Sequence, residues 1–298
     1  MSDIVLLDGS IGQELVNRLG DSPTKFWSTS VMLEHPGLVT EVHNDYFQAG
    51  ATIATTNTYS VLSDRLKGTD LEGSLHQLWD TAVNAATDAR NIKGVGRVAG
   101  SIGPLFASYR PDICPSASSA EKIYQEVTNI LASKTDLLLI ETMSSIDQAE
   151  GAIRAAVKTD VPVWLSFTVD DFDGTKLRSG ESLCNAKHLV DTYKPGAVLI
   201  NCSRPEAVTK AVEIISDFGV QFGAYANGFE EINNEFLEDS PTVAVLDKRS
   251  DLIPKTYAEF GMTWINMGAT IVGGCCEVGP THIRELAQKI ITAGHKIV

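Results

Sequence analysis

Eight short apolar runs alternate with longer helix-like stretches along the 298-residue chain, and this alternation limits the fold more than any other feature. The runs are almost continuously apolar, which is typical of strands in a parallel sheet whose faces are covered by helices. We therefore predict eight parallel strands, at Ile4–Leu7, Ala51–Thr55, Val98–Ser101, Leu137–Ile140, Val163–Phe167, Ala197–Ile200, Phe222–Tyr225 and Thr270–Val272.

A helix is predicted after each strand, at Gly37–Gln48, Leu71–Asn91, Ala120–Ser133, Ile146–Lys158, Ser182–Tyr193, Pro205–Asp217, Ile253–Asn266 and Pro280–Ala293. Eight strand–helix units in a chain of this length fit a closed barrel better than a doubly wound open sheet. No repeat, low-complexity segment or linker divides the sequence. We expect residues 1–298 to form one domain, a single (β/α)8 TIM barrel of the α/β class.

The charge balance excludes some classes of partner. Lysine and arginine number 24 and aspartate and glutamate 38, a formal net charge of −14, which argues against nucleic acid and anionic membranes. No apolar run approaches the ~20 residues of a membrane span, and the N-terminus lacks the pattern of a signal peptide. Five cysteines without a CxxC pair suit reduced thiols, so we expect a cytoplasmic protein without a disulfide framework.

Polar or ligating residues follow almost every predicted strand. In a barrel of this kind the reactive groups gather at the carboxyl ends of the strands. A capping or turn role is the commoner explanation for any single one of them, but together they predict a site on one rim. They are Asp8, Thr56, Asn57, Ser101, Glu141, Thr168, Asn201, Cys202, Asn227, Cys275 and Cys276.

Two adjacent cysteines follow the last predicted strand in the sequence Gly273-Gly274-Cys275-Cys276. Neighbouring side chains on a strand point to opposite faces, so both thiols can reach one atom only where the backbone leaves strand geometry. We expect the two glycines to allow this by adopting positive φ. A metal or redox site is one interpretation, and two small buried hydrophobic side chains are the other.

Cys202 strengthens the metal interpretation because it ends the sixth predicted strand, close to the eighth in a barrel. Three thiolates leave one position open around a tetrahedral ion, as in catalytic zinc sites, and soft sulfur ligands favour zinc over magnesium or calcium. Cys114 lies in a proline-flanked loop and Cys184 in a helical pattern, so we expect no role for either.

The sequence resembles the zinc-dependent homocysteine S-methyltransferases over essentially its whole length. The combination of Asn-Cys with Gly-Gly-Cys-Cys is the most specific part of the resemblance. The matching residues, in family order, are Leu6-Leu7-Asp8-Gly9-Ser10, Glu34-His35-Pro36, His43-Asn44-Asp45-Tyr46, Ala49-Gly50-Ala51, Ala99-Gly100-Ser101-Ile102-Gly103-Pro104, Glu141-Thr142, Ser166-Phe167-Thr168, Asn201-Cys202 and Gly273-Gly274-Cys275-Cys276.

This resemblance implies roles for individual residues. Cys202, Cys275 and Cys276 would hold Zn²⁺ and carry the catalysis. Asp8 and Glu141 would bind the amino group of homocysteine. The hydroxyl that helps to hold the homocysteine carboxylate maps to Thr56, or to Thr55 with a shift of one residue. Asn227, after the seventh strand, is also expected on the substrate side.

The methyl donor follows less directly. Three thiolates around Zn²⁺ carry a formal charge of −1, and the homocysteine thiolate makes it −2, so a cationic donor is favoured. The indole of Trp27 is placed after the first strand, where it could hold an onium ion; a packing role is the alternative. The compact branch of the family uses S-methylmethionine and sometimes S-adenosylmethionine, which is our expectation here.

Other donors and other classes of protein remain alternatives. The betaine-using branch has an aromatic residue where this chain has Thr142, and the cobalamin- and folate-dependent enzymes are much larger. After the seventh strand the S-methylmethionine branch reads Tyr-Pro-Asn-Ser-Gly-Glu, whereas this chain reads Tyr225-Ala226-Asn227-Gly228-Phe229-Glu230 and continues with acidic residues through Asp239. A non-catalytic zinc- or thiol-binding barrel would not need Asp8 and Glu141, and a metal-dependent hydrolase would use histidine and carboxylate ligands.

Overall fold

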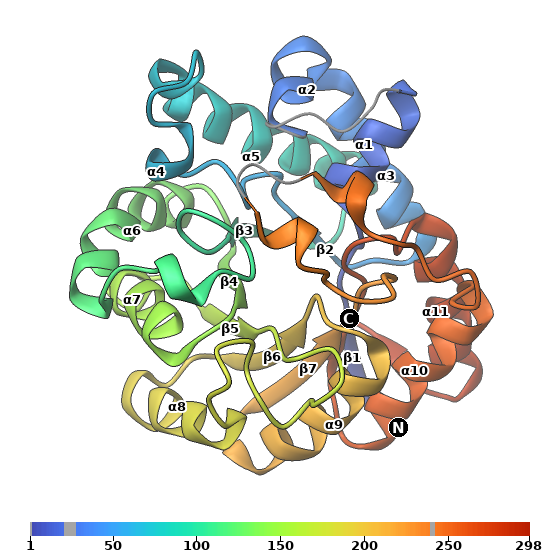
Figure 1. The fold of residues 1–298 in the computed structure, drawn as a ribbon. Coiled ribbons are helices and arrows are strands. Elements are labelled where there is room, and N and C mark those ends of the chain that lie inside the picture. The colour runs from blue at the N-terminus through green and yellow to red at the C-terminus, as the bar shows by residue number, and fades with distance from the viewer. Residues whose placement is uncertain (1, 21–27, 239–241) are drawn as a thin grey trace.

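Eight parallel strands form the wall of a barrel, and helices surround it (Figure 1). This computed structural model describes residues 2–20, 28–238 and 242–298. The wall strands are β1 Asp3–Leu6, β2 Ile53–Thr55, β3 Arg97–Ile102, β4 Leu137–Met143, β5 Val163–Phe167, β6 Ala197–Asn201, β7 Gln221–Tyr225 and β8 Ile271–Val272. The predicted (β/α)8 barrel is confirmed, with strand boundaries that differ by up to three residues.

The barrel closes between β1 and β2 through few backbone contacts. The sheet runs from β2 through β8 to β1, and one parallel bridge between Leu7 and Ile53 joins its two ends. The amide of Thr52 donates to the carbonyl of Leu6 at 2.7 Å in the same place. A ninth strand, β9 (Lys296–Ile297), pairs with the beginning of β1 on this edge. The sequence analysis did not predict β9.

All eight predicted helices are present, and three further α-helices are described. The unpredicted ones are α1 (Ile11–Leu19), α2 (Ser28–Glu34) and α4 (Ser63–Leu66). The predicted helices are α3 Pro36–Ala49, α5 Leu75–Lys93, α6 Ala117–Ala132, α7 Ile146–Ala156, α8 Lys187–Tyr193, α9 Pro205–Ile215, α10 Pro254–Asn266 and α11 Pro280–Thr292. The stretch predicted as one helix before Tyr193 begins with a 3-10 turn, Leu183–Ala186. No helix among the described residues is long and apolar enough to span a membrane.

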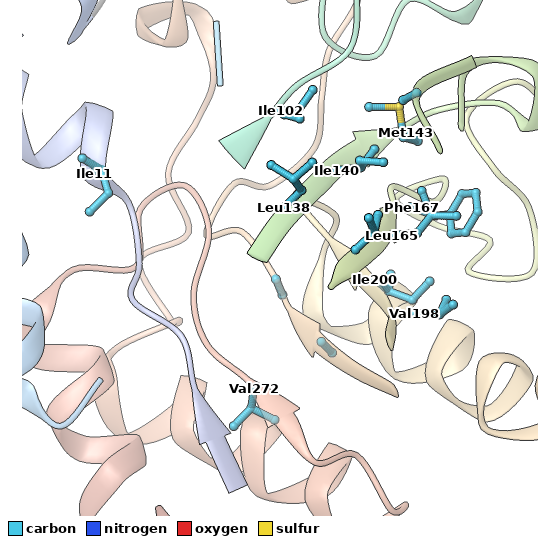
Figure 2. Packing of buried hydrophobic residues seen from close by; sticks show 14 of the residues in the cluster. Ile11, Ile102, Leu138, Ile140, Met143, Leu165, Phe167, Val198, Ile200 and Val272 are labelled. Carbon is cyan, nitrogen blue, oxygen red and sulfur yellow. The ribbon is translucent and has the colours of Figure 1, made fainter. Parts of the chain in front are cut away.

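Strand side chains alternate between two hydrophobic layers. On β4, Leu138 and Ile140 face the helices, and Figure 2 shows them with residues of β5 and β6 such as Phe167 and Ile200. The intervening side chains fill the barrel, and this inner layer includes Val5, Leu7, Ile53, Ala99, Leu137, Leu139, Trp164, Ala197, Leu199, Tyr225 and Ile271. This is the period of two expected of strands buried on both faces.

The inner positions become polar one step further along the strands. Two residues beyond Ile53, Ala99, Leu139, Trp164 and Leu199 the chain places Thr55, Ser101, Glu141, Ser166 and Asn201. The alternation therefore stacks a polar layer on the apolar layer, at the carboxyl end of the barrel. This layer is the floor of the candidate site.

A hydrophobic cluster covers this end. It comprises Tyr109 from the β3–α6 loop, residues of the β7–α10 loop such as Phe229 and Phe236, and Cys202. In Figure 1 the β7–α10 loop is the orange segment near the middle of the barrel. The mouth of the barrel is thus partly closed by side chains from two loops.

Candidate metal and substrate site

Three thiols from β6 and from the turn after β8 lie together at the barrel mouth. The sulfur atoms of Cys202, Cys275 and Cys276 are all within 4.8 Å of one another, and Cys202 Sγ is 3.7 Å from Cys276 Sγ. Around a tetrahedral zinc with Zn–S distances of about 2.3 Å, the sulfur atoms would be about 3.8 Å apart. Among the described residues, these three cysteines form a group of side chains whose geometry could hold a metal ion.

A left-handed backbone turns Cys202 toward its partners. Asn201 points into the barrel, so on a regular strand Cys202 would point out. Its φ of 51° breaks the alternation, while its amide still donates to the carbonyl of Tyr225 at 3.2 Å. A non-glycine residue in this region is strained, and such strain is common at functional sites.

The expected role of the two glycines is wrong in one respect. Neither Gly273 nor Gly274 has positive φ; in this turn it is Glu277 that does, at 65°. The glycines are required for space instead. A Cβ on Gly273 would lie 2.5 Å from Leu7 Cβ, and one on Gly274 would lie 2.2 Å from Val278 Cγ1. Close packing of the turn against β1 brings the two cysteines to the mouth.

The three thiols do not ionise equally. Hydrogen bonds from Cys275 and Cys276 hold the pKa of Cys202 well below the usual range for a thiol. The pKa values of Cys275 and Cys276 are held well above it, because both interact with the Cys202 thiolate and are buried. Protein groups alone therefore stabilise one thiolate here, and a bound cation is what would favour all three. The donor set fits zinc.

Two buried acids line the same cavity. Asp8 accepts hydrogen bonds from the Thr55 amide at 2.7 Å and the Thr55 hydroxyl at 2.8 Å. Glu141 accepts one from the Ser101 hydroxyl and another from the Tyr225 hydroxyl at 3.0 Å. Each carboxylate is fixed by side chains of other strands and has no cationic partner within the described residues.

Burial changes the ionisation of both acids. It raises the pKa of Asp8 to about 8, and the nearby negative charge of Glu141 adds to the effect. It raises the pKa of Glu141 to about 7. Such groups are poised to gain from an ammonium ion, because a positive charge at a few ångströms favours the ionised carboxylate. The chemistry of this pair of acids suits a primary amine.

The threonine hydroxyls are already engaged. Thr55 donates to Asp8, and Thr56 Oγ1 accepts from the Ser101 amide at 3.0 Å and lies 2.7 Å from Thr58 Oγ1. Because Thr58 donates to the Ser101 carbonyl at 2.6 Å, the Thr56 proton points to Thr58. Thr55 and Thr56 both line the cavity, but neither has a proton free for a substrate carboxylate.

The amino end of α1 lies on the cavity wall and was not foreseen. Residues Ile11, Gly12 and Gln13 line the cavity, and their amides have no acceptor within the described residues. Gln13 fixes this end of the helix, because its Oε1 accepts from the Glu277 amide at 2.8 Å. Free amides at a helix start attract carboxylates. The helical spacing of Ile11, Leu15 and Val16, which are buried in the structure, is the sequence pattern that could have predicted α1.

Asn201 organises the backbone between the acid and the thiols. Its Oδ1 accepts from the Thr142 amide at 2.9 Å and from the Ser166 hydroxyl at 2.7 Å, and its Nδ2 donates to Thr142 Oγ1 at 2.9 Å. Thr142 has a φ of 63°, a strained conformation for a β-branched residue. The strand-end pattern located Asn201, but not this role.

His43 is a second unforeseen neighbour of the site. It is completely buried on α3, and Nδ1 lies 4.0 Å from Asp8 Oδ2. Both ring nitrogens lack a partner within the described residues. Burial lowers its pKa to about 4, so the imidazole beside Asp8 stays neutral.

The remaining predicted residues lie elsewhere. Asn227 is buried, but it is not among the residues lining the cavity, and its Oδ1 accepts from the Phe229 amide at 3.3 Å. Trp27 lies outside the described residues. Cys114 and Cys184 are free thiols apart from the three-cysteine group.

Tyr109 forms part of the cavity roof. The cavity measures about 120 Å³ and contains all three thiols, both acids and the start of α1 on its walls. The Tyr109 side chain belongs to the same hydrophobic cluster as Cys202, and its φ is 61°. The cavity therefore brings together thiols, buried acids and the free amides at the start of a helix.

The chain is similar to known proteins over almost its whole length. The family model described as homocysteine S-methyltransferase matches residues 5–290. A homocysteine S-methyltransferase of Escherichia coli (strain K12) is 30% identical over 313 residues, covering 96% of this chain and 95% of the relative. A selenocysteine Se-methyltransferase of Brassica oleracea var. italica is 25% identical over 317 residues, covering 96% and 89%. The metallated form of the homocysteine methyltransferase MmuM from Escherichia coli has a TM-score of 0.79 at 27% identity, covering 97% of this chain and 96% of that one.

Proposed function

Because the chain belongs to the homocysteine S-methyltransferase family, it is an enzyme of methyl transfer to homocysteine, and we propose that its donor is a sulfonium and its cofactor zinc. The favoured donor is S-methylmethionine, with S-adenosylmethionine as the weaker one. The product is methionine. The observation that carries the proposal is that three thiols and two buried acids with raised pKa values line one cavity.

The three cysteines would hold the zinc ion. Coordination to zinc deprotonates a thiol outright, and this is the chemistry that the metal would supply to homocysteine. Cys202, Cys275 and Cys276 leave one of four positions for the substrate sulfur. Among the described residues no histidine or carboxylate joins this group, which favours methyl transfer over hydrolysis by metal-bound water.

The remaining residues would fix the amino-acid end of homocysteine. Asp8 and Glu141 receive the ammonium group, and Thr55 and Tyr225 hold these two carboxylates in place. The free amides at the start of α1 receive the carboxylate. Three-point binding orients the thiol toward the cysteines, which lowers the entropic part of the barrier.

The reaction then balances without a redox partner. The homocysteine sulfur forms a bond to the methyl carbon, and the donor's sulfur–carbon bond breaks with its electron pair returning to the donor sulfur. The donor leaves as a neutral thioether, and the thiol proton is released on ionisation. A cationic donor suits the acidic cavity, because transfer cancels one positive and one negative charge.

A donor panel tests the proposal. Methionine formation from homocysteine should be fastest with S-methylmethionine, slower with S-adenosylmethionine, and small with betaine or methyl-tetrahydrofolate. Faster turnover with betaine would overturn the donor assignment and leave the thiol site standing. A protein that binds zinc yet forms no methionine with any donor would instead match a zinc-binding barrel without catalysis.

A further inference from the structure

A histidine occupies a core position behind the substrate cavity without a hydrogen-bond partner. The buried face of α3 has the spacing of an amphipathic helix and comprises Val39, Val42, His43, Tyr46, Phe47 and Ala49. His43 is completely buried there, and neither ring nitrogen has a partner within the described residues. One turn further along, Tyr46 does have one, because its hydroxyl donates to the Val278 carbonyl at 3.1 Å. Packing on this face therefore does not explain the imidazole.

An unpaired imidazole in the core destabilises the protein. A buried donor without an acceptor costs the full free energy of its desolvation. Burial lowers the pKa of His43 to about 4, so the ring is neutral and carries one N–H. An apolar side chain would fill this position without that cost. We therefore expect His43 to form a hydrogen bond in another state of the protein.

Asp8 lies just beyond hydrogen-bond distance of this ring. Its Oδ2 is 4.0 Å from His43 Nδ1, roughly 1 Å more than an ordinary N–H···O bond. The Thr55 amide already donates to this oxygen at 2.7 Å, but a carboxylate oxygen has a second lone pair. A small rotation of the imidazole or of the carboxyl group would therefore let Oδ2 accept from Nδ1 as well.

The charge of Asp8 determines how strongly it attracts that proton. Burial and the nearby charge of Glu141 raise the pKa of Asp8 to about 8, so near neutral pH the acid is mostly protonated unless a cation is bound. A nearby ammonium ion favours the carboxylate. Hydrogen bonds to an ionised acceptor are shorter and roughly twice as strong as those between neutral groups. His43 therefore has most to gain from Asp8 when an amine is present.

We propose that His43 is a positioning residue of the amine site: its Nδ1–H donates to Asp8 Oδ2 when the ammonium group of the substrate binds there. The proposal rests on the function proposed above, in which Asp8 receives the amine of homocysteine. His43 is not among the described residues that line the cavity, so it acts through Asp8. Thr55 from β2 and His43 from α3 then hold the carboxylate between them.

Two variants of equal shape test the proposal. His43→Asn puts an amide nitrogen near the former Nδ1, and His43→Leu has nearly the same shape but no donor. The dissociation constant of homocysteine, measured by calorimetry, should rise roughly five- to twentyfold in His43→Leu and less than about twofold in His43→Asn. A merely structural role predicts the opposite order, because an unpaired amide in the core destabilises the protein more than leucine does.

A thiol without the amine is the control for folding and for the rest of the site. The dissociation constant of 4-mercaptobutanoate should be the same in the parent, His43→Asn and His43→Leu, because this ligand brings no cation to Asp8. In an Asp8→Asn background, His43→Leu should not weaken homocysteine binding further. Equal weakening of both ligands in His43→Leu would overturn the proposal, as would a homocysteine constant equal to that of the parent.

Nuclear magnetic resonance of protein with labelled histidine observes the hydrogen bond itself. The chain has six histidines, and the signals of His43 are those that His43→Asn lacks. The Nδ1 proton should move downfield when homocysteine binds and stay in place with 4-mercaptobutanoate. A ring proton on Nε2 in the homocysteine complex would overturn the proposal, because Nδ1 would then have no proton to donate.

The two proposals fail in different ways. If Asp8→Asn binds homocysteine as tightly as the parent does, Asp8 does not receive the amine, and the proposed function is wrong on this point together with the role of His43. If Asp8→Asn weakens homocysteine binding and His43→Leu does not, only the role of His43 is wrong.

Discussion

The φ angle of Cys202 decides whether the three thiols can meet at one point. At 51° it turns the thiol into the barrel mouth, where Cys275 and Cys276 meet it from β8. Left-handed geometry costs a non-glycine residue on the order of 1–2 kcal/mol, so other interactions must offset this conformational free energy. The hydrogen bonds of Asn201 to Thr142, which is also strained, hold the neighbouring backbone in place.

Replacing Cys202 should therefore abolish metal binding. We expect about one zinc per chain in the parent and well under one in Cys202→Ala, since two thiols make an incomplete site. Metal analysis of the purified proteins measures this. Cys184→Ala, which removes an exposed thiol outside the group, should keep the parent's zinc. Stoichiometric zinc in Cys202→Ala would contradict the ligand assignment.

The acids Asp8 and Glu141 predict a pH dependence with a definite sign. Their pKa values are raised to about 8 and about 7, so both are largely protonated at low pH in the free site. Ammonium binding needs them ionised. Affinity for homocysteine should fall as the pH drops from 8 toward 6, by up to about tenfold per pH unit for each acid that must ionise.

A thiol without the amine isolates this effect from ionisation of the thiol. The dissociation constant of 4-mercaptobutanoate should change less with pH than that of homocysteine, because it makes no demand on the acids. Glu141→Gln should flatten the homocysteine profile without loss of zinc. Parallel profiles for the two ligands would mean that Asp8 and Glu141 do not receive the amine.

At the scale of elements, the period of two in the strands made most of the fold predictable. It placed eight strands and eight helices, and it brought the residues after β1, β4, β6 and β8 to one rim. Helix α1 was missed because its short apolar face follows the glycine-containing turn after β1. The amide groups that line the cavity there were missed with it.

Loop conformation is what the sequence pattern could not supply. Tyr109 reaches Cys202 through a loop in which Phe106 and Tyr109 both have positive φ, and through contacts with Phe236 and Arg178 from other loops. None of these follows from the spacing of apolar residues. The meeting of the three thiols was predictable because strands place them. The roof of the cavity was not predictable.

The turn after β8 should be intolerant of added volume. Gly273→Ala would push a methyl group to 2.5 Å from Leu7 Cβ, next to Asp8, so we expect a loss of about 1–3 kcal/mol in the free energy of unfolding. Gly37→Ala is the control, since a Cβ there meets nothing within 4 Å on α3. Denaturant unfolding should show Gly37→Ala equal to the parent or slightly more stable. Equal stability of both variants would refute the packing argument.

At the scale of the whole molecule, zinc would tie β6 to the segment that joins β8 and α11. A ligand that binds only the folded state adds to its stability, so a strong chelator should lower the melting temperature of the parent by a few degrees or more. Cys202→Ala should show no such shift. Differential scanning fluorimetry with and without chelator measures both, and an equal shift in the two proteins would exclude the three-thiol site as its cause.

Within the described residues, one backbone bridge closes the barrel between β1 and β2. At the same place both carboxylate oxygens of Asp8, which follows β1, accept hydrogen bonds from Thr55 on β2. Asp8, the acid proposed to bind the substrate amine, thus also joins β1 to β2. A substrate amine that draws charge onto Asp8 strengthens its hydrogen bonds to the next strand. Binding of a substrate in the cavity would therefore also stabilise the contact between β1 and β2. Without a substrate, this closure of the barrel is at its weakest.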